Sequence, residues 1–203
     1  IGTQYTPIHI AVGASDPGQQ NNMPGNVIYA SSIAGTNGNP GTAAYAQAGQ
    51  AGNTTDAYTV RVSNAITAQS DNFAGFTVGA LYTQNGTTTS PGTGDTTNNY
   101  TGWGAKVDYT WNKLYVVGVM QRLKSYNISP TATLTSPTPS IWSATSGGTN
   151  TQDNQAYVAA TYDFGILKAY LQYVNRKDTS TLNTNYFAKR SAQQIGVRSY
   201  ITP

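Results

Sequence analysis

The pattern of a β-hairpin runs through residues 101–124, TGWGAKVDYTWNKLYVVGVMQRLK. Apolar residues occupy every second position from Trp103 to Trp111, and Lys106 and Asp108 stand between them. Because successive side chains of a strand point to opposite faces, one face is apolar and the other carries the charges. Asn112-Lys113 supplies a two-residue turn before the second alternating run. The pattern predicts two antiparallel strands and leaves open which face meets water.

The composition is unusual for a soluble domain. Only 9% of the 203 residues are charged, against about 25% in a typical soluble domain. The mean hydropathy is nevertheless −0.40, because Thr, Asn, Ser and Gln supply the polarity. Cysteine is absent, which excludes disulfides and thiolate metal sites. The length fits one β domain, and the net charge of +3 is a weak argument for a nucleic-acid partner.

Alternating segments recur along the chain from Tyr58 onward. Tight turns at 70–74, 112–113 and 165 alternate with long loops rich in Gly, Asn, Thr and Ser. This alternation predicts consecutive antiparallel strands whose two ends lie in different environments. Segments of about 10 to 13 residues match the ~9–11 residues that a tilted strand needs to cross a bilayer. The predicted strands are 58–69, 75–84, 100–111, 114–126, 154–164, 166–177 and 191–201.

Basic residues follow the polar faces of these predicted strands. Seven of the eleven do so, and none of the seven lies on an apolar face: Arg61, Lys106, Arg122, Lys124, Lys168, Arg176 and Arg198. A soluble sandwich with its polar faces outward gives the same alternation of apolar and polar residues. Alternation alone therefore does not distinguish a soluble sandwich from a membrane barrel. Aromatic residues lie mostly near the ends of the apolar faces, as in the girdles of membrane barrels. Their placement favours a membrane barrel.

Residues 7–57 interrupt the strand pattern. Gly, Pro, Asn and Gln dominate this segment, and its Ala-rich stretch 42–51 is compatible with one or two helical turns. A loop of this length in a compact domain is either disordered or functional. Strand-like residues stand before it, at 2–5, and after it, from Tyr58, which favours a folded insertion.

Enzymatic chemistry has the least support in the sequence. His9 is the only histidine. A metal site needs several convergent ligands, so a packed or hydrogen-bonded histidine is the favoured interpretation. No Ser or Asp stands in a recognisable nucleophile context, and the eight acidic residues are all Asp, mostly in predicted loops or turns. We therefore expect no enzyme activity, no metal and no cofactor.

Four stretches carry a resemblance to a known family: GTQYTP (2–7), GASDP (13–17), RVSN (61–64) and NFAGFTVGALY (72–82). Their order and spacing resemble the trimeric general porins of Gram-negative outer membranes, particularly the betaproteobacterial, Comamonas- and Delftia-like anion-selective branch. The resemblance covers nearly the whole chain, but its specific motifs lie in residues 1–20 and 58–82. Thr3 departs from the family pattern, which has Arg at this position.

The resemblance implies an all-β fold, a transmembrane antiparallel barrel of sixteen strands in the family. This chain then resembles an internal fragment of that single domain, with a strand end at 1–6, the constriction loop at 7–57 and about eight consecutive strands in all, the rest at 58–203. The implied function is passive diffusion of small hydrophilic solutes across the outer membrane, with a preference for anions. The implied partners are two further copies in a homotrimer, outer-membrane lipid or lipopolysaccharide, and small anionic solutes, with no nucleic acid.

The resemblance also implies that Arg61 faces the pore beside the infolded loop, whose acids are Asp16 and Asp56. A basic wall opposite an acidic loop sets a transverse field that sorts solutes by charge. Seven inward cations against inward Asp108 and Asp163 would favour anions. The simpler interpretation of any one of these residues is a solvated charge, and Asp16 is equally an ordinary turn residue before Pro17.

Two other interpretations of the whole chain stay open. One is a secreted all-β carbohydrate-binding or adhesion module whose loops, rich in Tyr, Asn and Thr, contact sugar. The other is a smaller closed barrel of eight strands.

Overall fold

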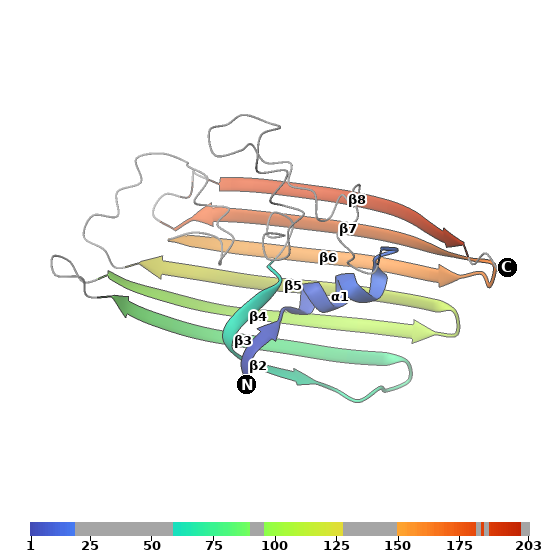
Figure 1. Ribbon diagram of the computed structural model, residues 1–203, viewed down its shortest axis with the longest axis horizontal. Helices are drawn as coiled ribbons and strands as arrows, with labels where there is room; N and C mark the ends of the chain where they lie inside the picture. The colour runs from blue at the N-terminus through green and yellow to red at the C-terminus, as the bar shows by residue number, and fades with distance from the viewer. Residues whose placement is uncertain (19–58, 90–95, 128–149, 182–183, 185–186, 200–203) are drawn as a thin grey trace.

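The computed structural model describes residues 1–18, 59–89, 96–127, 150–181, 184 and 187–199. They form one antiparallel sheet of eight strands in which each strand neighbours the next in sequence (Figure 1). The elements are β1 (Gly2–Tyr5), α1 (Pro7–Ser15), β2 (Arg61–Gln69), β3 (Phe76–Thr89), β4 (Thr96–Trp111), β5 (Leu114–Asn127), β6 (Thr151–Asp163), β7 (Leu167–Ser180) and β8 (Phe187–Ser199).

A strand lies at each predicted position, in the predicted order; β2 begins at Arg61, and residues 58, 200 and 201 of the predicted strands lie outside the described residues. Several strands run further toward the long loops than predicted, so that β3 reaches Thr89 and β6 begins at Thr151. The tight turns also stand where expected, with Asn112 and Gly165 at φ values of 51° and 92°. Asn and Gly are the residues that take this left-handed conformation most readily. The described strands form an open sheet that is not closed into a barrel. The alternative of a smaller closed barrel of eight strands does not agree with this arrangement.

Strand β2 bends sharply at Asn64, whose φ is 50°. Only its second half pairs with β3, from Ala65 onward, and its first half pairs with β1. Figure 1 shows this first half and β1 lying across the sheet. Val62 and Ala65 are both buried. Residues three apart in a regular strand lie on opposite faces, so a bulge between them has shifted the alternation. Strict alternation would place Ile66 on the same face as Val62, but Ile66 is exposed.

Helix α1 covers one face of the sheet, which we call the inner face. It packs mainly on β4, β5 and β6 (Figure 1). Ile8 and Val12 are fully buried there, and their cluster includes Val117, Val119 and Tyr157. No helix among the described residues is long and apolar enough to cross a membrane.

The opposite, outer face is apolar and exposed. The strand registers place the following exposed residues on it: Phe76, Val78, Tyr82, Trp103, Val107, Trp111, Met120, Val158, Tyr162, Leu171, Tyr173, Ile195 and Val197. The inner face buries charged and amide side chains, including Lys106, Asp153, Gln155 and Arg176. A soluble domain has the reverse arrangement, with apolar side chains buried and charges exposed.

Candidate functional site

The register of β5 separates two predicted pore residues from the others. Arg122 pairs with Trp103 and Lys124 pairs with Thr101, so both basic side chains lie on the outer face. Lys106 lies on the inner face of the neighbouring strand β4 and is 7% exposed. The prediction that all seven basic residues share one polar face is therefore wrong for Arg122 and Lys124.

The cause of this inversion is the contact between β5 and helix α1. Val117, Val119 and Leu123 alternate with Met120 and Arg122 along β5, lie on the inner face and are 0%, 3% and 1% exposed. Val117 and Val119 form the apolar surface on which Ile8 and Val12 pack. Burial of Val117 and Val119 under the helix determines which face of β5 points inward. Arg122 then lies on the outer face.

Four of the other predicted residues lie on the inner face of the sheet. Lys106 forms an ion pair with Asp108, and the Tyr115 hydroxyl donates to the other carboxylate oxygen of Asp108 at 2.6 Å. Lys168 is half-buried, and its neighbours in register are Asp163 on β6 and Arg198 on β8, which is exposed. Arg176 lies nearer the long loops.

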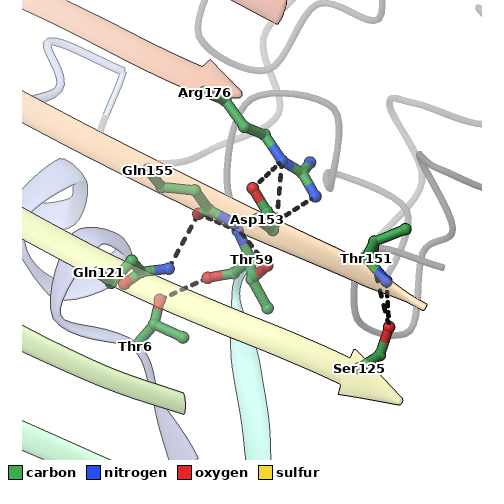
Figure 2. A network of polar contacts seen from close by, with 8 residues as sticks. All are labelled: Thr6, Thr59, Gln121, Ser125, Thr151, Asp153, Gln155 and Arg176. Atoms are coloured by element: carbon green, nitrogen blue, oxygen red, sulfur yellow. Dashed lines mark hydrogen bonds and ion pairs between the residues drawn. The ribbon is translucent and has the colours of Figure 1, made fainter. Parts of the chain in front are cut away.

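Arg176 is fully buried and makes an ion pair with Asp153 (Figure 2). Its Nε donates to both carboxylate oxygens at 3.0 Å, and its Nη2 donates to Oδ2 at 2.6 Å. A planar guanidinium matches a carboxylate in this two-point geometry. This pair was not predicted, because it depends on the register between β6 and β7.

The Asp153–Arg176 pair continues into a network of amide and hydroxyl groups (Figure 2). Gln155 Nε2 donates to Asp153 Oδ2 at 2.5 Å and to Thr59 Oγ1 at 3.0 Å. Its Oε1 accepts from the Thr59 backbone N–H and from Gln121 Nε2, both at 2.9 Å. The Thr6 hydroxyl donates to the Thr59 carbonyl. The network therefore joins β5, β6 and β7 to the residue that begins α1.

Thr6 also explains why a helix starts at this point. Its side chain accepts a hydrogen bond from the His9 N–H at 3.3 Å, as an N-cap residue does, and Pro7 occupies the first turn. A Cβ added at Gly104 would lie 2.9 Å from Pro7 Cγ, so glycine there permits the close approach of α1. This helix was not predicted, although the pair Thr6-Pro7 is a signal for a helix start that the sequence contains. The predicted helical turns at 42–51 lie outside the described residues.

The C-terminal end of α1 is also fixed to the sheet. The Ser15 and Tyr157 hydroxyls share a hydrogen bond of 2.6 Å, and Gln172 Nε2 donates to the Ser15 carbonyl at 2.6 Å. Asp16 is the C-cap residue, 2% exposed, and its backbone N–H donates to Val12 at 2.8 Å. Asp16 thus has a structural position at the helix end, while Asp56 lies outside the described residues.

Arg61 stands apart from the sheet, exposed, on the half of β2 that crosses the inner face. Its guanidinium carbon lies 5.0 Å from the centre of the Tyr5 ring, and that ring stacks on His9 with centroids 4.6 Å apart. A guanidinium over an aromatic face is attracted by the ring while its charge stays available to solvent. Arg61, Tyr5 and His9 therefore form an ordered cationic stack above the inner face.

A pocket of about 180 Å³ adjoins this stack. Tyr5, Pro7 and Leu81 contribute to its lining, together with the polar side chains of Gln4 and Lys106. The volume is below the ~300–1,000 Å³ of sites for drug-sized ligands. It has room for only a small molecule, and most of its lining is apolar.

The inner-face charges are more balanced than the sequence suggested. Among the residues whose side chains are described, the basic ones there are Arg61, Lys106, Lys168, Arg176 and Arg198, and the acidic ones are Asp16, Asp108, Asp153, Asp163 and Asp178. Lys106 and Arg176 are buried in ion pairs, whereas Arg61 and Arg198 are exposed.

His9 is expected to titrate far below an ordinary histidine. Burial, and secondly the positive charge of Arg61, lowers the pKa of His9 from 6.5 to about 4. Because the folded pKa lies below the unfolded one, the contribution of His9 to stability is complete above about pH 6.5 and is lost as the pH falls toward 4. As the only histidine, it can be followed by its imidazole proton resonances without assignment. A midpoint near 6.5 in the folded protein would contradict this environment.

No protein-family model and no curated protein matches the sequence.

Proposed function

We propose that this chain belongs to an outer-membrane diffusion channel of the porin class, with its outer face in lipid and its inner face toward an aqueous path. The observation that carries the proposal is the inverted distribution of side chains. Val158 and Leu171 are each 54% exposed, while Arg176 and Asp153 are fully buried on the opposite face. An exposed apolar face of this extent needs an apolar partner, and a bilayer core supplies one for every strand.

The shape of the apolar band gives independent support. On the outer face, the first polar residue met on going toward the long loops is Gln84 on β3, Thr101 on β4, Arg122 on β5, Asn154 on β6, Asn175 on β7 and Gln193 on β8. Relative to the hydrogen-bonded register, this edge moves by six residues between β4 and β8.

That displacement corresponds to an angle. Six residues span roughly 20 Å along a strand, and four strand spacings span roughly 19 Å across the sheet. The edge of the band therefore crosses the strands obliquely at about 45°. Strands of membrane barrels are tilted by about 35–45° to the bilayer normal, which produces an oblique edge of this kind.

The inner face supplies what a solute path requires. Helix α1 narrows the space above β4–β7, and the cationic stack of Arg61, Tyr5 and His9 presents an exposed charge beside it. In a narrow aqueous gap, a fixed charge raises the local concentration of counter-ions. We therefore propose passage of small hydrophilic solutes with a preference for anions, and association into trimers.

A planar lipid bilayer tests the channel directly. The intact protein should produce stepwise increases in conductance and should aggregate when detergent is removed without lipid. The alternative, a secreted carbohydrate-binding or adhesion module, has no need of the exposed outer face. Stable monomers in detergent-free buffer, together with no conductance, would favour that alternative.

Arg61→Ala is expected to shift the selectivity of the channel toward cations. One charge at about 4 Å in water contributes ~1 kcal/mol, which corresponds to a roughly fivefold fall in the ratio of anion to cation permeability. The reversal potential in a salt gradient measures this ratio. Lys113→Ala is the matched control, because Lys113 is exposed in the turn between β4 and β5 and should leave the ratio unchanged. Equal reversal potentials for wild type and Arg61→Ala would remove Arg61 from the path.

A further inference from the structure

The pocket beside the Arg61–Tyr5–His9 stack lies between two walls on the inner face. Tyr5, Pro7 and Ile10 line it from β1 and the beginning of α1. Its other wall belongs to β2, β3 and β4, and Leu81 and Lys106 contribute to it. The volume of about 180 Å³ restricts the pocket to small molecules.

The charge in the pocket is already compensated. Among the described residues that line it, Lys106 alone is charged, and its ammonium forms an ion pair with Asp108. The Tyr115 hydroxyl donates to the other carboxylate oxygen of Asp108 at 2.6 Å, so two donors hold this carboxylate. A charged ligand would enter without a counter-charge, and burying an unpaired charge is costly. The pocket therefore favours an uncharged ligand.

Hydrogen-bonding groups for such a ligand are present. The Lys106 ammonium has three N–H donors, and one of them goes to Asp108. Gln4 and Gln69 add primary amides to the lining, and an amide both donates and accepts. A ligand with one amide or hydroxyl group can therefore exchange its hydrogen bonds with water for hydrogen bonds with the pocket.

The apolar lining sets a second requirement. Pro7 and Leu81 are buried, and Ile10 is half-buried beside them. A short alkyl chain against these side chains leaves water, which is favourable. Gly79 belongs to the same wall as Lys106, and a Cβ added at Gly79 would lie 3.4 Å from Lys106 Cε. A side chain at position 79 would therefore narrow the space available to the ligand.

We infer that this pocket binds a small uncharged organic molecule that combines a short alkyl chain with an amide or hydroxyl group. The inference goes beyond the proposed channel and does not rest on it, because the described residues form the pocket without a membrane. Within a channel, the pocket would hold uncharged solutes beside the exposed charge of Arg61.

The test is a titration of the intact protein, in neutral detergent at pH 7, with butanamide, butanoate and butylammonium, which are similar in size and differ in charge. The imidazole proton resonances of His9 report binding, because His9 is the only histidine and its ring stacks on Tyr5 in the pocket wall. The pKa of His9 is about 4, so the imidazole stays uncharged throughout. Butanamide should give a saturable shift with a dissociation constant on the order of 1–10 mM. The two ions should bind at least roughly tenfold more weakly.

Gly79→Ala should weaken the binding of butanamide severalfold, because the added methyl group occupies part of the pocket. Gly118→Ala is the matched control. Gly118 lies on the outer face in register with Val158, and a Cβ added there meets nothing within 4 Å. The control should bind butanamide as the wild type does.

Three results would decide the matter. A shift that rises with butanamide concentration without saturating, or equal affinity of Gly79→Ala and the wild type, would overturn the inference. Tighter binding of butanoate than of butanamide would assign the pocket to anions and overturn the uncharged ligand. Saturable binding of butanamide, weakened by Gly79→Ala, in a protein that does not conduct in bilayers would support the pocket and refute the channel alone.

Discussion

Val158→Arg is expected to destabilise the bilayer-inserted protein by about 2–4 kcal/mol, the cost of a basic residue at the bilayer midplane on the lipid face of a barrel. Val158 is 54% exposed on the outer face, and Gly118 and Tyr173 flank it in register. In the proposed orientation Val158 faces lipid, which cannot solvate a guanidinium. Urea unfolding of the protein in phosphatidylcholine vesicles measures the free energy of unfolding.

Gln152→Arg is the matched control for this change. Gln152 lies on the same face of β6 but beyond the apolar band, in register with Lys124. A basic residue near the interface costs only about 0–1 kcal/mol. A soluble module predicts a different outcome, because an exposed surface substitution changes stability by within about 0.5 kcal/mol at either position. Equal, small effects of both substitutions would therefore contradict the lipid-facing assignment of the outer face.

Strand positions were predictable because the pattern that marks a strand is local. Alternation at every second residue needs only neighbouring positions, and turn chemistry such as that of Asn112 needs only a few. The same rule assigned the outer face of β4, β6 and β7, where Trp103, Val158 and Leu171 are exposed. These strands have one clearly apolar face, so their orientation follows from their own residues.

The orientation of β5 was not predictable by that rule, because both of its faces carry apolar residues. Val117 and Val119 alternate with Gly118 and Met120, and only packing against α1 selects the valines for burial. That helix itself comes from a segment more than 100 residues earlier in the chain. The bend at Asn64 could not be predicted from the sequence either, since an asparagine within a strand does not by itself indicate a bulge.

The candidate site was predicted in part. The alternation of residues along each strand placed Lys106, Lys168, Arg176 and Arg198 on one face, and the strand registers agree. Alternation could not predict which acidic residue pairs with each of them. Asp153 meets Arg176 only because β6 and β7 adopt one register, in which Asp153 lies directly across from Asp178. Registers depend on the whole sheet, so the ion pairs and the network around Gln155 required the structure.

Asp153→Ala is expected to destabilise the folded protein by about 3–5 kcal/mol, because it removes the carboxylate that is hydrogen-bonded to the buried Arg176 guanidinium. Arg176 and Asp153 are both 0% exposed. Chemical unfolding measures the loss. Asp71→Ala provides the control, since Asp71 is exposed between β2 and β3 and should change stability by within about 0.5 kcal/mol. A loss for Asp153→Ala as small as that of the control would show that Arg176 does not depend on this carboxylate.

The double variant D153L/R176M distinguishes the effect of the ion pair on the stability of the fold from its effect on the position of helix α1. Replacing a buried ion pair by apolar residues of similar size is often neutral or stabilising, so the double variant should regain most of the lost stability. It cannot replace the acceptor that Asp153 gives to Gln155, which holds Thr59 and, through it, Thr6 at the start of α1. The imidazole midpoint of His9 should therefore rise from about 4 toward 6.5 as α1 loosens. Recovery of stability with an unchanged His9 midpoint would mean that α1 is held by its apolar contacts alone.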